Sequence, residues 1–242
     1  MAELTLTTFV TLDGVMQAPG GPDEDRSEGF EYGGWAAPYV DEGMGEFVTE
    51  VFGRAGAFLF GRKTYEIFAS YWPEHDDPAD PVPGRLNRLH KYVASTTLKE
   101  PAWGPVTVLD GEHLQGEIVR VKDALDGELQ VHGSGQLAQW LLARDLVDEL
   151  NLLVFPVVLG TGRRLFPTGG LPTAYELTAS RTTPVAPPST PTAPRGARRS
   201  ARSAPDRPRA EPAASGGDPI DRCSRSGAPR VAPRATPRGT PR

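Results

Sequence analysis

The spacing of hydrophobic side chains changes along the first 180 residues from the alternation of strands to the three- and four-residue spacing of helices. Residues 4–12 alternate threonine with larger apolar side chains, which predicts a strand, and the turn dipeptide Asp13-Gly14 ends it. Apolar side chains recur at helical spacing over 40–54, which predicts a helix. The succession of the two patterns indicates an α/β domain.

Shorter segments continue this alternation. Further strands are predicted at 57–60, 91–95, 106–109, 129–132, within 149–159 and near 175–182. Further helices are predicted at 62–71, 117–125 and 136–144. Residues 19–38 are rich in Gly, Pro and acidic side chains and carry three aromatic residues, so we expect a long loop of the kind that often has a function.

Composition divides the chain into two parts. Residues 1–180 hold 13 Lys and Arg against 27 Asp and Glu, whereas residues 181–242 hold 13 Arg and four acids. The last 62 residues also carry 13 of the 25 prolines and no aromatic residue, so they cannot bury enough surface to offset chain entropy. We therefore expect one globular domain, 1–183, and a disordered tail, 184–242.

Several classes of protein are disfavoured by what the chain lacks. The N-terminus has no apolar signal core, and the longest apolar run, 152–159, is too short to cross a membrane and contains Pro156. The single cysteine, Cys223, lies in the tail, and the four histidines show no spacing typical of metal ligands. These observations predict a cytoplasmic protein without membrane contact, disulfide or metal site.

A strand-to-helix junction at residues 57–66 has the composition of an anion site. The apolar run stops at Gly61, and Arg62, Lys63 and Thr64 follow where the unpaired N–H groups of a helix start point outward. Two cations and a hydroxyl would complete a phosphate cradle. The alternative interpretation is an ordinary turn with solvated basic side chains.

A second junction of the same kind follows the predicted strand 129–132. Its glycines and Ala138 match the spacing G-x-G-x-x-G/A, but no acid follows the next strand, as a Rossmann domain would require. The match therefore favours a diphosphate cradle on another fold. The residues assigned to this cradle are Gly133, Ser134, Gly135, Gln136 and Leu137.

Hydroxyl side chains end the strand predicted between the two junctions. Ser95, Thr96 and Thr97 stand in a row there and could bind a ribose phosphate, the alternative being a polar turn. Two cradles and a hydroxyl cluster in one domain predict one long, multiply phosphorylated ligand.

Taken in order, these motifs resemble a known superfamily. The sequence contains Leu-Asp-Gly-Val near the N-terminus, Phe-Gly-Arg-Lys-Thr-Tyr-Glu, the hydroxyl-bearing strand end, Val-His-Gly-Ser-Gly, and Phe-Pro-Val-Val-Leu-Gly-Thr-Gly-Arg-Arg-Leu-Phe at 155–166. This order resembles the dihydrofolate reductase-like superfamily, and most closely its branch of reductase domains from bacterial riboflavin-biosynthesis deaminase/reductases. The resemblance covers residues 1 to about 183.

The resemblance implies a three-layer α/β/α fold around a mixed, mainly parallel eight-stranded sheet, and it implies NADPH as cofactor. Arg62, Lys63 and Thr64 would contact cofactor phosphates, with Gly61 at the turn. Ser95 and Thr96 would lie beside the adenosine 2′-phosphate, and 133–137 would pack on the diphosphate. The absence of an acid at the ribose-reading position also suits NADPH better than NADH.

The resemblance says less about the substrate end. The segment after the first strand closes over the nicotinamide in this superfamily, which nominates Val15, Met16 and Gln17, and Trp35 is a candidate substrate wall. Asp41 is the nearest match to the carboxylate that lies against the pterin in true dihydrofolate reductases, although Glu42 or Glu46 could serve instead. The alternatives are acids that favour a helix N-terminus and a core aromatic.

The chain departs from the superfamily at Pro184. Another strand normally follows there and pairs with the strand predicted near 175–182, but Arg, Pro, Ala and Gly replace it. We interpret the tail as the product of a reading-frame change in a GC-rich gene, and we favour an inert tail over a basic arm that binds nucleic acid. The missing strand would leave a sheet edge unpaired.

These inferences predict an NADPH-dependent reductase that transfers hydride to a small heterocyclic substrate, such as a ribosylaminopyrimidine or a pterin-like compound. A protein that binds NADPH without turnover is the alternative, because no acid is firmly placed. The resemblance and the open edge also predict a homodimer.

Overall fold

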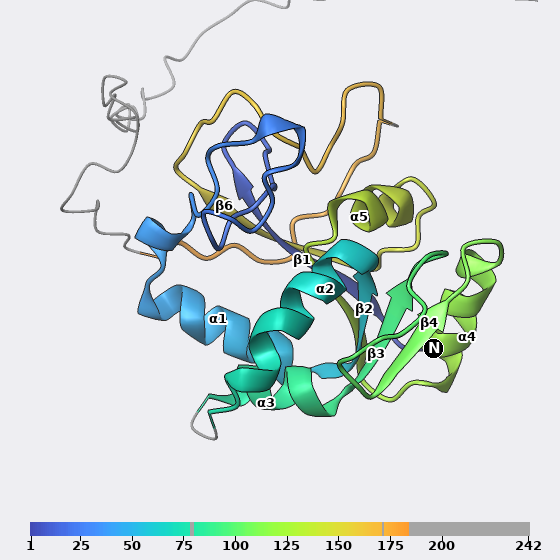
Figure 1. Ribbon diagram of the computed structural model, residues 1–242. Helices are drawn as coiled ribbons and strands as arrows, with labels where there is room; N and C mark the ends of the chain where they lie inside the picture. Colours follow the sequence, from blue (N-terminus) through green and yellow to red (C-terminus); the bar gives the residue numbers. More distant parts are fainter. Residues whose placement is uncertain (78–79, 171, 184–242) are drawn as a thin grey trace, which may run out of the picture. The chain divides into compact units, whose positions relative to one another are not determined.

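The computed structural model describes residues 1–77, 80–170 and 172–183 (Figure 1). The strands are β1 Leu4–Thr11, β2 Ala55–Gly61, β3 His90–Ala94, β4 Val106–Leu109, β5 Glu128–His132 and β6 Glu149–Phe155. The α-helices are α1 Glu42–Gly53, α2 Arg62–Tyr71, α3 Pro81–Arg88, α4 Leu114–Ala124 and α5 Gly135–Leu142. Three short 3₁₀ helices occupy Ser27–Gly29, Ala37–Tyr39 and Trp72–Glu74.

The described strands form one six-stranded sheet in the order β4-β3-β2-β5-β1-β6. Every pairing between neighbouring strands is parallel. The expected α/β class is therefore confirmed, but the expected eight-stranded, mixed sheet is corrected to six parallel strands. In a parallel sheet all carboxyl ends meet at one edge, which is where open α/β sheets bind ligands.

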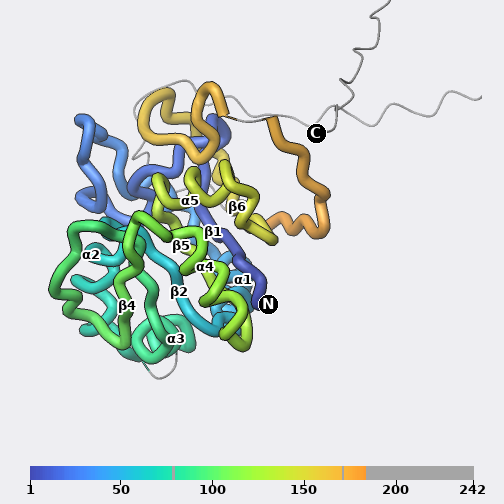
Figure 2. Tube along the Cα trace, turned by 90° about the vertical axis from the view of Figure 1, so that its right-hand side faces the viewer, coloured from blue at the N-terminus to red at the C-terminus, as the bar shows by residue number. Residues whose placement is uncertain are grey.

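Helices cover both faces of the sheet, and two cores result. Buried residues of β2, α2 and α3, with Phe52 of α1 and Trp103, form the core on one face. Buried residues of α4 and α5 pack against apolar side chains of β1, β2 and β5 on the other face. In Figure 1, α1 and α3 lie to the left of and below the strands with α2 across them, and α4 and α5 lie to the right and above; Figure 2 shows the same elements turned by 90°. Parallel strands need such double coverage because both of their faces are apolar.

The prediction of a strand near 175–182 is wrong. Residues 172–183 form no strand in the structure, and residues 172–182 are exposed. Arg181 is held to α1 by an ion pair with Glu50 (3.2 Å). Its alternating pattern alone could not make a strand, because an edge strand needs a partner for its N–H and C=O groups. Within the described chain β6 is consequently an edge strand, with Leu152 and Val154 exposed by 40% and 57%.

Helix α3 has no counterpart among the predicted elements. It begins at Pro81, and the Asp80 side chain accepts a hydrogen bond from Val82 N (2.9 Å). An Asp N-cap followed by Pro at the first helical position is a recognisable helix start. This dipeptide was the signal that the hydrophobic pattern, interrupted by two prolines and a glycine, concealed.

Among the described helices, none has the length and apolar composition that a membrane crossing requires. The expectations for the tail, 184–242, fall outside the described residues. The expectations of a cytoplasmic protein and of a homodimer stay predictions.

Candidate cofactor and substrate site

Three neighbouring strands carry the predicted phosphate-binding segments at their carboxyl ends. β3, β2 and β5 lie side by side and end at Ala94, Gly61 and His132, immediately before or within the segments 95–96, 61–64 and 133–137. The sheet order therefore brings together three segments that are as much as 76 residues apart in sequence. This juxtaposition supplies the binding surface that one long ligand would need.

The two glycine-containing junctions contact each other directly. Gly61 N donates a hydrogen bond to Ser134 Oγ (3.0 Å), and Ser134 itself has left-handed backbone angles (φ 58°, ψ 59°) before α5. Gly61 has φ −76° and ψ 154°, so its backbone needs no glycine, contrary to the sharp turn that the sequence suggested. A Cβ there would lie 3.6 Å from Ser134 Cβ, which is an ordinary contact distance, so the packing of the two junctions does not require glycine either.

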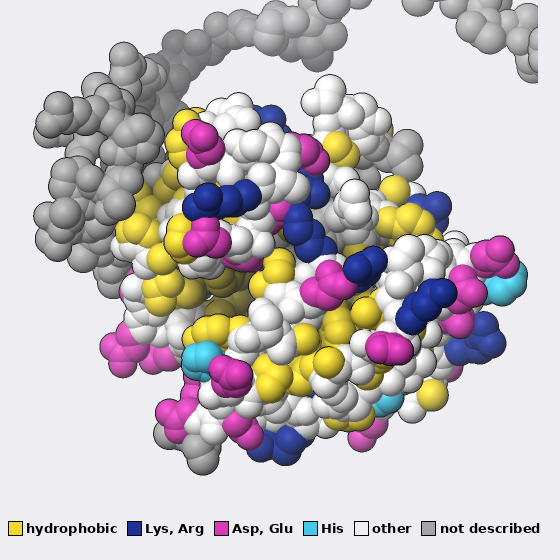
Figure 3. Space-filling model, viewed as in Figure 1, with side chains coloured by type: hydrophobic (Ala, Val, Ile, Leu, Met, Phe, Trp, Pro, Cys, Tyr) yellow, Lys and Arg dark blue, Asp and Glu magenta, His cyan; other side chains and the backbone are white. Residues whose placement is uncertain are grey.

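A cavity of about 1400 Å³ extends from these junctions across the sheet. It is lined by all nine predicted residues of the two cradles, and it continues inward past β1 and α1. Figure 3 shows a hollow lined by hydrophobic side chains on this face, with basic side chains near its upper rim. The cavity exceeds the usual 300–1000 Å³ of a small-ligand pocket, so it has room for a cofactor and a second molecule.

Arg62 joins the first cradle to the hydroxyl-bearing turn. Its Nη1 donates to Thr97 Oγ1 (2.7 Å) and its Nε to Glu66 (2.7 Å). Ser95 Oγ accepts from the backbone N–H groups of Thr97 and Leu98, so it shapes this turn. Ser95 and Thr96 do not line the cavity wall itself. The structure thus places the hydroxyl turn beside Arg62, at the outer end of the cavity.

An ion-pair cluster that the sequence analysis missed occupies the mouth of the cavity. The Asp25 carboxylate accepts from Lys63 Nζ, from Arg163 Nη2 (2.5 Å) and from Ser27 Oγ (2.6 Å). Burial raises the pKa of Asp25, but the hydrogen bonds from Lys63 and Ser27 and the charge of Arg163 outweigh it and lower the pKa to about 2. Asp25 therefore stays charged and holds two cations in place.

The residues nominated for the substrate end divide into two groups. Met16 and Gln17 line the cavity, and Gln17 Oε1 accepts from Arg163 N (3.0 Å). Val15 and Trp35 are instead buried in a third core with Phe155, and Trp35 Nε1 donates to Gln17 O (2.7 Å). Trp35 therefore positions the Gln17 backbone from behind the cavity wall.

The structure places Asp41 at the start of α1 and not on the cavity wall. Its Oδ1 accepts from Met44 N (2.8 Å), which is the geometry of a helix N-cap. The acids that do line the cavity are Asp23, Glu24, Asp25 and Glu66. The catalytic role predicted for Asp41 stays a prediction that this position does not support, since a cap acts on its own helix.

Asp13 connects the first and last family motifs. Its carboxylate accepts from Gly160 N (2.8 Å), Leu159 N (3.2 Å) and Thr11 Oγ1 (2.6 Å). Burial opposes ionisation, but these hydrogen bonds prevail and lower the pKa of Asp13. The Leu-Asp-Gly-Val segment is therefore a structural clamp that fixes the loop carrying Arg163.

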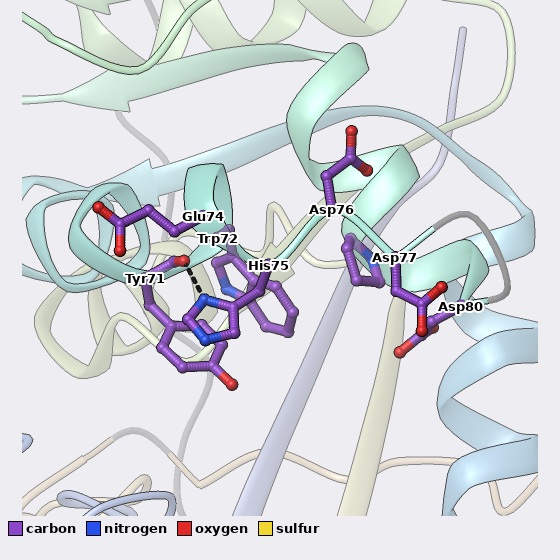
Figure 4. A pocket seen from close by; sticks show the side chains of 8 residues that line it. Tyr71, Trp72, Glu74, His75, Asp76, Asp77 and Asp80 are labelled. Carbon is purple, nitrogen blue, oxygen red and sulfur yellow. Dashed lines mark hydrogen bonds between the residues drawn. The ribbon is translucent and has the colours of Figure 1, made fainter.

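A second hollow, of about 460 Å³, lies beside Tyr71 and His75 (Figure 4). The His75 ring stacks on Tyr71 with centroids 3.8 Å apart, and His75 Nδ1 lies 2.6 Å from Tyr71 O. Four acids line this hollow, and the figure shows Glu74 and Asp80 on opposite sides of it. Within the described residues no group of His, Cys, Asp and Glu could hold a metal ion. An acidic, open hollow would repel phosphate, so the larger cavity is the candidate site.

Comparison with known proteins agrees with these features. The RibD C-terminal domain family matches residues 2–186. The chain is 27% identical to the uncharacterized protein YyaP of Bacillus subtilis (strain 168) over 166 residues. The aligned region covers 67% of this chain and 79% of that protein.

Solved structures with similar folds include a riboflavin biosynthesis protein and a dihydrofolate reductase. The structure from Shewanella sp. PV-4, which is named as a riboflavin biosynthesis protein, is 24% identical to this chain. The match covers 72% of this chain and 86% of that chain, with a TM-score of 0.48. Dihydrofolate reductase of Schistosoma mansoni is 20% identical, with 67% and 80% covered and a TM-score of 0.40. Since the family match spans most of the chain and includes every motif described above, the chain belongs to the RibD C-terminal domain family, which has a dihydrofolate reductase-like fold.

Proposed function

We propose that this protein is an NADPH-dependent reductase that transfers hydride to a small heterocyclic substrate. The single observation that carries the proposal is the hydrogen bond between Gly61 N and Ser134 Oγ, which joins the starts of α2 and α5 at the mouth of one large cavity. Two helix N-termini that meet in this way favour a diphosphate. The family to which the chain belongs uses NAD(P)H.

The residues present fit such a cofactor. Lys63, Thr64 and the backbone of 133–137 would hold the diphosphate, because neither α2 nor α5 has a side-chain cap on its first N–H groups. Arg62, with the hydroxyl turn beside it, would hold the 2′-phosphate that distinguishes NADPH from NADH. The bound cofactor supplies the hydride, and the protein supplies orientation and exclusion of water.

The inner half of the cavity would receive the hydride acceptor. Apolar side chains from α1 and α2, among them Val48, Phe52 and Phe68, line it together with Met16 and Gln17. Such walls exclude water and hold a flat ring against the cofactor, which shortens the path for transfer.

A titration with NADPH and with NADH, followed by nicotinamide fluorescence, tests the proposal. We expect the protein to prefer NADPH, and Arg62→Ala to weaken NADPH binding by about tenfold or more while changing NADH binding little, since a charge-assisted hydrogen bond contributes about 1.5–3 kcal/mol. Arg120→Ala is the matched control, because Arg120 lies on the exposed face of α4 and donates only to Gly116 O. Equal binding of NADPH by the parent and by Arg62→Ala would refute the cofactor assignment.

A protein that binds NADPH without turnover is the second candidate. The position of the acids that line the cavity favours this candidate. All four lie on the loop 23–25 and on α2, whereas β1 and α1, which build the inner half of the cavity, contribute no acid to its lining. NADPH oxidation in the presence of candidate heterocycles separates the two functions. Binding without substrate-dependent oxidation would support the second.

A further inference from the structure

The inner wall of the cavity contains a buried hydroxyl without a partner. Thr7 lies in the middle of β1, is 5% exposed and lines the cavity. Its Oγ1 forms no hydrogen bond with any residue that the structure describes. A buried polar group in this state costs free energy, and native proteins rarely leave one unpaired, so this hydroxyl is a candidate to bind a ligand.

His132 stands directly beside this hydroxyl. It is the last residue of β5 and the parallel partner of Thr7, and it lines the same cavity. The Phe52 ring stacks on its imidazole with centroids 4.2 Å apart, so one face of the ring is covered. Burial lowers the pKa of His132 to about 3, which keeps the imidazole neutral at physiological pH.

The neighbouring amide determines which imidazole nitrogen carries the proton. Gln130 Nε2 donates to Val51 O (2.6 Å) and to Glu128 Oε2 (2.8 Å), so Gln130 Oε1 is left as an acceptor. His132 Nε2 lies 3.1 Å from this oxygen and must therefore be the donor. In the neutral ring Nδ1 then carries a lone pair, and the described residues offer it no donor.

The inner cavity thus presents one acceptor, His132 Nδ1, and one hydroxyl that can donate, Thr7 Oγ1, on adjacent strands. Aromatic and aliphatic side chains surround the pair, including Phe9, Val51 and Phe52. No carboxylate lines this end, so a cationic ligand would find no counter-charge. A flat, neutral molecule with a hydrogen-bond donor next to an acceptor would match both groups.

We propose that Thr7 and His132 recognise the lactam edge of a planar, uncharged heterocycle. The ring N–H donates to His132 Nδ1, and the adjacent carbonyl accepts from Thr7 Oγ1. This inference rests on the proposed function, because it assigns the inner cavity to the hydride acceptor, and it adds the chemical class of that acceptor and the two side chains that select it.

The test compares lumazine, a pteridine with lactam N–H groups, with 1,3-dimethyllumazine, in which methyl groups replace those hydrogens. Binding of each is measured by calorimetry on the full chain, with and without NADP⁺. We expect the parent to prefer lumazine by about tenfold or more, since each matched hydrogen bond is worth a few-fold to tenfold in affinity. Thr7→Val is expected to weaken the binding of lumazine at least about threefold, because it removes the donor to the carbonyl, whereas Thr7→Ser, which keeps the hydroxyl, is expected to bind lumazine like the parent.

Thermal unfolding without ligand gives an independent readout. Because Thr7 Oγ1 has no partner in the protein, Thr7→Val is expected to melt at the same temperature as the parent or higher. A valine variant that binds lumazine more weakly but unfolds no earlier supports a ligand-binding hydroxyl. A variant that melts earlier overturns the proposal, because the hydroxyl would then have a structural partner.

His132→Phe provides the second variant, since it keeps an aromatic ring against Phe52 and removes the acceptor. It is expected to lose the preference for lumazine, because the acceptor of the ring N–H is gone. Unchanged lumazine affinity in Thr7→Val, an unchanged preference in His132→Phe, or no binding of lumazine to the parent would overturn the inference. Failure of NADPH to bind, with the lumazine preference intact, would instead count against the proposed cofactor.

Discussion

At the scale of single residues, the basic side chains around the cavity are all paired with acids of the protein itself. Arg62 pairs with Glu66, Lys63 and Arg163 with Asp25, and Arg164 with Asp13. A cofactor phosphate would therefore have to replace a carboxylate of the protein as the partner of each basic side chain, because each of these cations is already paired. The Arg62–Glu66 pair is exposed on both sides and therefore weak, so an exchange at Arg62 costs little, whereas the carboxylate of Asp25 is largely buried.

Asp25→Asn is expected to tighten NADPH binding by about fivefold, because it removes a carboxylate that competes for Lys63, and an ion pair whose cation is half exposed is worth up to about 1 kcal/mol. Fluorescence titration at low and at high salt measures the effect, which should shrink as salt rises. Asp23→Asn is the matched control, since Asp23 lies on the same loop and pairs with Arg26 only. Weaker binding by Asp25→Asn would show that the carboxylate positions Lys63 for the cofactor and does not compete with it.

At the scale of elements, the two helices that start at the predicted phosphate cradles, α2 and α5, differ at their N-termini from α1 and α3. Asp41 caps α1 and Asp80 caps α3, whereas α2 and α5, which start at the cavity, have no side-chain cap. Their first N–H groups stay available to a ligand. The side-chain caps thus bond N-terminal N–H groups of α1 and α3 within the protein, whereas those of α2 and α5 form part of the candidate site.

Replacing Asp41 separates capping from catalysis. Asp41→Ala is expected to lower the free energy of unfolding by about 1 kcal/mol, whereas Asp41→Asn, which can still accept from Met44 N, should be nearly neutral. Urea unfolding gives both values, and NADPH oxidation by the folded variants gives the rates. If Asp41→Asn abolished oxidation while unfolding like the parent, Asp41 would be catalytic, as the sequence resemblance suggested.

At the scale of the whole molecule, one face of the parallel sheet carries buried polar groups between its apolar cores. Gln130 is fully buried, and His132 is 8% exposed and neutral. Such groups make the stability of the domain depend on pH. An unfolded His132 would bind a proton below its ordinary pKa of 6.5, whereas the folded protein binds it only near a pKa of about 3.

Stability is therefore expected to fall as pH drops from 6.5 toward 3, by up to about 1.4 kcal/mol per pH unit from this one residue. Urea unfolding at pH 7, 6, 5 and about 4 measures the slope, and His132→Phe should flatten it. His75→Gln, at an exposed position, serves as the control for the loss of a histidine. Asp25, whose pKa falls from 3.8 to about 2, adds a further loss as pH drops from about 3.8 toward 2, which is below the lowest pH measured. An equal slope in the parent and in His132→Phe would contradict this account.

The sequence by itself determined most of the elements and one end of the site. Period and turn residues are local properties, so they predicted the six strands, the positions of α1, α2, α4 and α5, and the two cradles that line the cavity. They failed where the outcome depended on a distant partner. The alternating segment 175–182 has no strand beside it, so the sheet of the described residues keeps six strands.

Only the tertiary structure decided which side chains face the cavity. The strand order β3-β2-β5 joined the cradles, and the loop contacts of Asp13 brought Arg163 to Asp25. The same packing placed Val15, Trp35 and Asp41 off the cavity wall, and Thr7 and His132 on it. Sequence patterns record the period of an element but not its neighbours, and a binding surface is made of neighbours that the chain brings together from distant positions.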